Sequence, residues 1–141
     1  MRFWDSSAIV PLTVSETSSV ALRGLLAEDP EMVVWWSTEI ECVSALARRE
    51  RERQVSGDDF LAAMTDLTAF AANWQEVAPT REVRETAKRL LRLHPLRGAD
   101  ALQLAAALAV AENDPASLSF VTLDLRLRDA ASRHGFLQVL P

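Results

Sequence analysis

Short hydrophobic runs alternate along the chain with longer stretches in which apolar residues keep a helical spacing. The short runs are rich in Val, Phe, Trp and Leu, which predicts β-strands. They lie at residues 2–5, 32–36, 74–78, 119–123 and 135–139. In the longer stretches apolar residues recur every three or four positions, as on one face of an α-helix. Helices are expected at residues 15–27, 38–54, 59–72, 79–93, 99–112 and 125–134.

Strands and helices alternate from one end of the chain to the other. This order is typical of an α/β protein, and we expect a three-layer α/β/α sandwich with a mostly parallel central sheet. Residues 99–112 are nearly all Ala and Leu, so that helix should be buried. Ser6 and Ser7 are interpreted as turn residues that end the first strand, and Ser15 as the cap of the first helix. Without repeats or linkers, residues 1–141 are predicted to form a single domain.

Composition limits where the protein works and which chemistry it uses. Of its 141 residues 49% are hydrophobic, enough for a core that needs no covalent staple. Cys42 is the single cysteine, which excludes an internal disulfide and a thiolate cage for zinc. We interpret it as a small buried hydrophobe, because the neighbouring Glu41 would raise its thiol pKa. No signal peptide or membrane span is recognisable, so a cytoplasmic location without membrane attachment is expected.

The net charge of −5 argues at first against a nucleic-acid partner. Basic residues nevertheless come in two local runs, and each run is either an RNA contact or a solvated helix face. They comprise Arg48, Arg49, Arg51 and Arg53, and then Arg81, Arg84, Lys88, Arg89 and Arg92. His94 and His134 are interpreted as surface residues near helix ends, not as catalysts.

Three aspartates stand where a hydrophobic core should exclude them. Asp5 and Asp124 follow buried strands, and Asp100 begins the most apolar helix. Two of them have a plain alternative reading, Asp100 as an N-cap or first-turn acid and Asp124 as an N-cap. Because functional groups of parallel sheets gather beyond the strands' carboxyl ends, the three are expected to converge. Their mutual repulsion should then raise the pKa of at least one of them in the metal-free protein. Such an oxygen-rich cluster suits Mg²⁺ or Mn²⁺, which could activate water and offset charge on phosphorus.

Four segments taken in order resemble one protein family. They are Asp5-Ser6-Ser7-Ala8-Ile9-Val10 with Glu16 after it, Glu41-Cys42-Val43-Ser44-Ala45-Leu46-Ala47-Arg48, Asp100-Ala101-Leu102-Gln103-Leu104-Ala105, and Val121-Thr122-Leu123-Asp124-Leu125-Arg126-Leu127. Together they resemble the VapC toxins, and the resemblance covers essentially the whole chain. It implies a PIN fold and an Mg²⁺- or Mn²⁺-dependent endoribonuclease that hydrolyses phosphodiester bonds in single-stranded RNA. It also implies a cognate VapB-like antitoxin and a homodimer.

The resemblance also assigns roles to individual residues. Asp5 and Asp100 match the principal metal ligands, Glu41 and Asp124 match the remaining acids, and all four match the catalytic set. Thr122 matches a hydroxyl two residues before the last acid. Glu39 is a rival to Glu41, but residues two apart point about 200° apart on a helix, and by helical phase Glu39 falls on the inward apolar side. A catalytically inactive PIN domain that binds RNA or protein is the alternative function.

Overall fold

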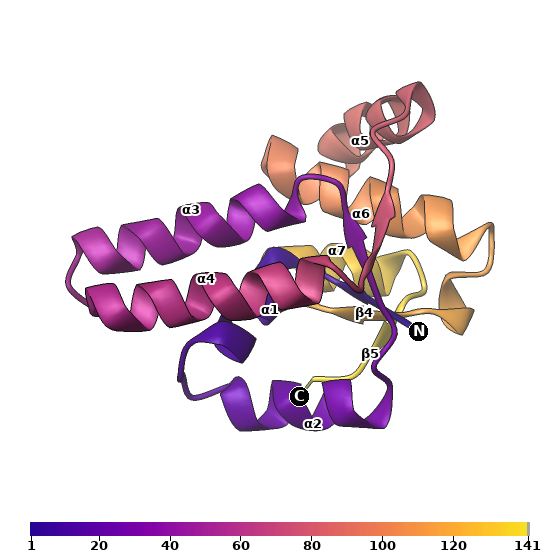
Figure 1. The fold of residues 1–141 in the computed structure, drawn as a ribbon. Coiled ribbons are helices and arrows are strands. Elements are labelled where there is room, and N and C mark those ends of the chain that lie inside the picture. Colours follow the sequence, from indigo (N-terminus) through magenta and orange to yellow (C-terminus); the bar gives the residue numbers. More distant parts are fainter. Residues whose placement is uncertain (141) are drawn as a thin grey trace.

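The computed structural model describes residues 1–140, which contain five strands and seven α-helices (Figure 1). The strands are β1 (Arg2–Trp4), β2 (Met32–Trp35), β3 (Gln75–Val77), β4 (Ser119–Val121) and β5 (Leu137–Gln138). The helices are α1 (Ser6–Thr13), α2 (Ser19–Glu28), α3 (Thr38–Arg51), α4 (Gly57–Ala71), α5 (Arg81–Leu93), α6 (Gly98–Ala111) and α7 (Leu125–Arg133). A 3-10 turn at Pro115–Ser117 precedes β4.

All strand pairs are parallel, and the sheet has the order β3-β2-β1-β4-β5. The chain therefore builds one half of the sheet outward from β1 and then returns to place β4 on the other side of β1. Ligands of such doubly wound sheets bind in the crevice where the direction of winding changes. Here the crevice lies beyond the carboxyl ends of β1 and β4.

Alternating strand residues feed two separate hydrophobic cores, one on each face of the sheet. Phe3 and Phe120 face the core formed with α5, α6 and α7. Trp4 and Val121 face the other core, formed with α1, α2, α3 and α4. The predicted α/β/α sandwich is confirmed, and the sheet is parallel throughout. The apolar helix α6 is largely buried, as expected, with Leu104 and Ala105 to Ala107 shielded from solvent.

The main error of the sequence prediction lies directly after β1. Ser6 and Ser7 do not end the strand in a turn; they are the first residues of α1. Asp5 caps this helix, because its side chain accepts a hydrogen bond from the Ser7 backbone N–H. Ser15 caps nothing, since α2 starts only at Ser19.

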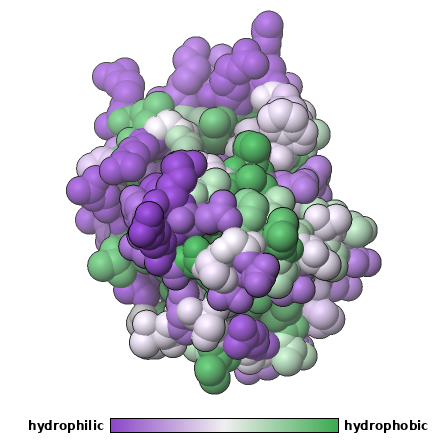
Figure 2. Space-filling model, turned by 60° about the vertical axis from the view of Figure 1, so that its left-hand side comes forward, coloured by the Kyte–Doolittle hydropathy of each residue, from purple (hydrophilic) through white to green (hydrophobic). Residues whose placement is uncertain are grey.

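Hydrophobic side chains interrupt the hydrophilic surface on the face that Figure 2 shows. Across residues 1–140, the large apolar side chains that solvent reaches include Trp36 and Ile40, 56% and 65% exposed. No helix in this part of the chain is both long and apolar enough to cross a membrane.

Candidate active site

Asp5 is held at the crevice between β1 and β4. The chain leaves β1 with a backbone hydrogen bond from Asp5 to the Val121 carbonyl oxygen, 3.0 Å long. The side chain is only 4% exposed. A carboxylate buried to this degree must be compensated by hydrogen bonds or positive charge.

Three hydrogen bonds converge on one oxygen of Asp5. Oδ2 accepts from the Ser7 backbone N–H at 3.2 Å, from the Ser7 hydroxyl, and from the Thr122 hydroxyl at 2.9 Å. The Thr122 oxygen in turn accepts from the Asp124 backbone N–H at 3.1 Å. Thr122 thus ties the Asp5 carboxylate to the backbone of Asp124, and Oδ1 of Asp5 is left for another partner.

Glu41 reaches the same region from the first turn of α3. Its Oε2 accepts from the Ser37 hydroxyl at 2.7 Å and from the Gln103 amide at 3.1 Å. Gln103 is fully buried in α6 and also donates to the Thr38 hydroxyl, 3.1 Å away. Glu39, which the sequence offered as a rival to Glu41, is exposed and lines a different pocket, with Trp36 and Val43. The expectation that Glu39 lies on the inward side was therefore wrong.

Asp124 is the N-cap of α7, and Asp100 lies in the first turn of α6, where its side chain bonds the N-cap backbone. Oδ2 of Asp100 accepts from the Arg97 backbone N–H at 3.3 Å, at the start of α6. Oδ1 of Asp124 accepts from the Leu127 backbone N–H at 2.9 Å, at the start of α7. Both capping readings from the sequence are correct, and they do not compete with a second role. In each carboxylate only one oxygen takes part in the cap.

One pocket of about 720 Å³ is lined by all four predicted acids. Glu16, from the segment between α1 and α2, adds a fifth carboxylate. Three arginines also line it, namely Arg48, Arg49 and Arg97. A smaller neighbouring pocket brings Arg126 beside Asp100 and Asp124. Of the basic runs, only the one on α3 contributes to the acid-lined pocket.

Burial, with added repulsion between the acids, makes three of them harder to ionise. Burial is the main cause that raises the pKa of Asp5, and the nearby Asp100 raises it further. Burial likewise raises the pKa of Glu41, with added repulsion from Asp5. The pKa of Asp100 is raised by burial and then by Asp124. The predicted direction is confirmed, but desolvation outweighs the mutual repulsion from which it was predicted.

The donor set fits a hard divalent cation by its chemistry. Every candidate ligand is a carboxylate oxygen, the kind that Mg²⁺ and Mn²⁺ prefer, and a cation would relieve the burial and crowding that raise the pKa values. Among residues 1–140, no three acidic, histidine or cysteine side chains stand close enough together to hold a metal as they are. A cation would therefore have to draw the unbonded oxygens inward.

Sequence reasoning missed Ser7, Gln103 and the pairing of Glu16 with Arg49. Gln103 had a readable signal, because it is the one amide in an apolar helix and lies three residues after Asp100, on the same face. Ser7 was hidden by its interpretation as a turn residue. The ion pair of Arg49 and Glu16 joins two segments whose proximity no local pattern shows.

Three side chains that were set aside as non-catalytic do not line the acid pocket. Cys42 is fully buried, and burial, followed by repulsion from Asp5 and Glu41, raises the pKa of its thiol, as expected. His94 and His134 are not simple surface residues, since their Nε2 atoms lie 2.9 Å apart in a hydrogen bond. Burial lowers the pKa of His134.

Comparisons with known proteins agree with this architecture. The PIN-domain profile matches residues 2–132. Ribonucleases VapC45 and VapC49, from two strains of Mycobacterium tuberculosis, are each 34% identical over 133 residues, 94% of this chain and 90% of theirs.

Two solved structures share the fold at 20% sequence identity. VapC20 of Mycobacterium tuberculosis, a sarcin-ricin loop cleaving toxin, superposes with a TM-score of 0.68 over 100% of both chains. PAE2754 of Pyrobaculum aerophilum superposes with a TM-score of 0.66 over 97% of this chain and 87% of its own. At this identity the likeness speaks for the fold alone. The profile and the two ribonuclease relatives show that the chain belongs to the PIN-domain family, in its VapC group.

Proposed function

We propose that this protein is the toxin of a toxin-antitoxin pair, an Mg²⁺- or Mn²⁺-dependent endoribonuclease that hydrolyses phosphodiester bonds in single-stranded regions of RNA. The observation that carries the proposal is the pocket in which Asp5, Glu41, Asp100 and Asp124 meet from four distant segments. Relatives named ribonucleases, similar over nearly the whole chain, give that pocket its substrate class.

The four acids are proposed as both the catalytic and the metal-binding residues. Asp5 and Asp100 would be the principal ligands, and Glu41 and Asp124 would complete the set directly or through water. When bound, the cation supplies a Lewis acid that activates water and offsets charge on the scissile phosphate. One oxygen of each acid accepts a hydrogen bond that holds the side chain in place. The other oxygen is left as a ligand for the metal.

The protein's own groups would do the remaining work. Thr122 and Ser7 orient Asp5, and Gln103 orients Glu41, through the hydrogen bonds described above. Arginines at the rim offset the charge of the RNA backbone. Neither histidine lines the acid-lined pocket, so proton transfer is assigned to water and the carboxylates.

The remaining parts of the proposal concern partners and context. We propose that residues 1–141 form a single PIN domain, that it assembles as a homodimer, and that a cognate VapB-like antitoxin neutralises it. The cytoplasm, where RNA is present, is the proposed location. None of these assignments requires contact with a membrane.

The test is cleavage of a mixed RNA pool by the purified protein with Mg²⁺ or Mn²⁺. EDTA and the variant Asp100→Asn serve as controls on the same gel. Cutting that needs the metal and is lost in both controls is the expected result. Cutting that persists in the variant would reveal a contaminating nuclease. An uncut pool would replace the enzyme by a catalytically inactive PIN domain that binds RNA or protein.

Thr122 gives a prediction that separates orientation from metal binding itself. Thr122→Val keeps the shape of the side chain but removes the hydroxyl that donates to Asp5 at 2.9 Å. Loss of a hydrogen bond behind a metal ligand should lower kcat/KM for RNA by about 10- to 100-fold. Thr122→Ser, which keeps the hydroxyl, should retain most of the activity. Full activity in Thr122→Val, with a loss in Thr122→Ser, would show that the methyl group, and not the hydroxyl, matters.

A further inference from the structure

Arg49 is the one arginine at the acid-lined pocket that is both held in place and short of a partner. Its Nη2 forms an ion pair with Oε1 of Glu16, 2.8 Å away. Its Nη1 is screened from solvent and has no hydrogen-bond partner among residues 1–140. A shielded donor without an acceptor is costly, so native structures rarely leave one unless a ligand or water completes it.

The surroundings of Arg49 indicate which kind of ligand its side chain suits. Both Arg49 and Glu16 line the acid pocket, and their side chains are 25% and 29% exposed. Glu16 supplies a carboxylate oxygen to Nη2, and Nη1 has no acceptor among residues 1–140. A guanidinium fork binds phosphate oxygens well, because two N–H groups can donate in parallel.

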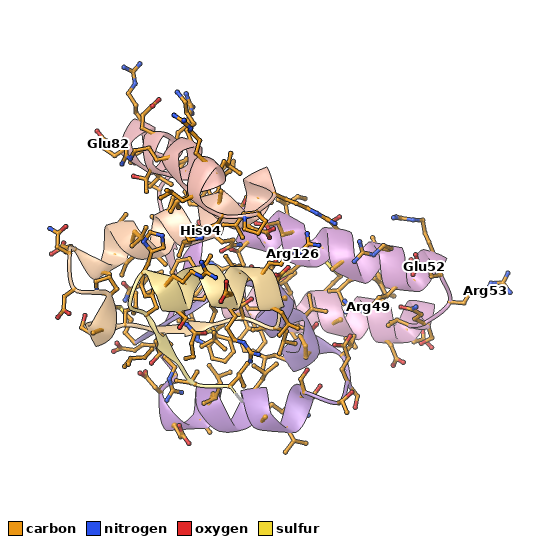
Figure 3. The ribbon with its side chains drawn as sticks, turned by 180° about the vertical axis from the view of Figure 1, so that it is seen from behind. Arg49, Glu52, Arg53, Glu82, His94 and Arg126 are labelled. Carbon is orange, nitrogen blue, oxygen red and sulfur yellow. The ribbon has the colours of Figure 1, made fainter. Side chains whose placement is uncertain are left out.

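Arg49 stands too far along α3 to serve the phosphate at the acids. It follows Glu41 by eight residues, which corresponds to roughly 12 Å along a helix axis. Figure 3 shows Arg53 projecting from the far end of α3, away from the rest of the chain, whereas Arg49 lies closer to the sheet. At that distance Arg49 can reach a phosphate that neighbours the one at the acids.

From these observations we propose that Arg49, positioned by Glu16, binds a backbone phosphate of the RNA strand on the α3 side of the cleavage point. This inference rests on the proposed ribonuclease function and adds a binding residue to it. Arg97 and Arg126, at the starts of α6 and α7, stand beside Asp100 and Asp124 instead. The strand therefore leaves the acids over α3, and its contact with Arg49 sets how tightly it binds.

The experiment compares Arg49→Gln with wild-type protein in the cleavage of a short, labelled single-stranded RNA. The variant should raise KM about tenfold with little change in kcat, because the contact is equally present in ground and transition states. The slope of log KM against log salt should fall by about 0.7, the change for one phosphate contact to a single strand. Arg49→Lys should keep the slope, since the charge remains, with an intermediate KM.

Arg51→Gln is the matched control. Arg51 is an exposed arginine of the same helix, about 200° from Arg49, and does not line the pocket. Its loss should change neither KM nor the slope. If Arg49→Gln cleaves with unchanged KM and slope, the proposal is overturned and Arg49 only links α3 to the segment before α2. If wild-type protein cuts no RNA, the ribonuclease function itself fails. Should Arg49→Gln not fold, Arg49→Lys decides by its KM.

Discussion

Asp5→Asn is expected to lower kcat/KM for RNA about a thousandfold or more, while making the metal-free protein more stable. The loss of activity follows because the substitution removes a proposed metal ligand and with it the charge that would hold the cation. The gain in stability follows from the raised pKa of Asp5, which shows that the fold favours its neutral form over its charged form. Asparagine is neutral at every pH.

The asparagine side chain fits where Asp5 stands. Its carbonyl oxygen can accept the hydrogen bonds from Ser7 and Thr122 that now reach Oδ2, and its NH₂ group would face the pocket. We expect the free energy of unfolding in EDTA near neutral pH to rise by about 1 kcal/mol, within the usual range for stabilising substitutions. Urea denaturation measures this change, and a gel cleavage assay measures the activity.

Asp66→Asn is the matched control for both measurements. Asp66 is an exposed aspartate of α4, far from the acids in sequence and not part of their pocket. Its substitution should leave activity and stability nearly unchanged. An Asp5→Asn protein that is inactive but also less stable would mean that Asp5 contributes to folding. The proposal that Asp5 lowers stability and is kept for activity would then be wrong.

The convergence of the acids could be predicted because it follows from strand topology. Asp5 and Asp124 follow strands that pair in the sheet, and the carboxyl ends of parallel strands share one edge. Asp100 was included because it begins an apolar helix, and Glu41 was assigned by its position in a family motif. The capping and site readings were weighed as rivals, yet one carboxylate has two oxygens and serves both.

Other features of the site could not be predicted, because they depend on how segments meet. Ser6 and Ser7 have the composition of a turn, but the Asp5 cap and the buried side chains of Ile9 and Val10 make α1 a helix. The hydrogen bond from Gln103 to Glu41 joins α6 to α3 across the core. Burial, the main cause of the raised pKa values, is likewise a property of the packed chain and not of any motif.

The stability of the metal-free protein is expected to fall as pH rises above about 4, and Mn²⁺ is expected to reverse that trend. Asp5, Glu41 and Asp100 have ordinary pKa values of 3.8, 4.5 and 3.8, and all three are raised in the folded protein. The folded state then binds protons more tightly than the unfolded chain does. The stability that these protons provide is complete at low pH and is lost as pH passes the raised values.

A bound cation competes with those protons, so Mn²⁺ should bind more tightly as pH rises. At a free concentration about 100 times its dissociation constant, it should add about 2.7 kcal/mol, or roughly 10 °C in Tm. Thermal unfolding from pH 4 to 8, with EDTA or Mn²⁺, measures both trends.

Other groups also titrate, among them Asp29, whose pKa is lowered mainly by its hydrogen bond with the N-terminal amine. Subtracting the profile of Asp5→Asn removes such shared contributions, because that variant retains them. A Tm that Mn²⁺ leaves unchanged at pH 8 would count against the metal site, since competition from protons is weakest at that end of the pH range.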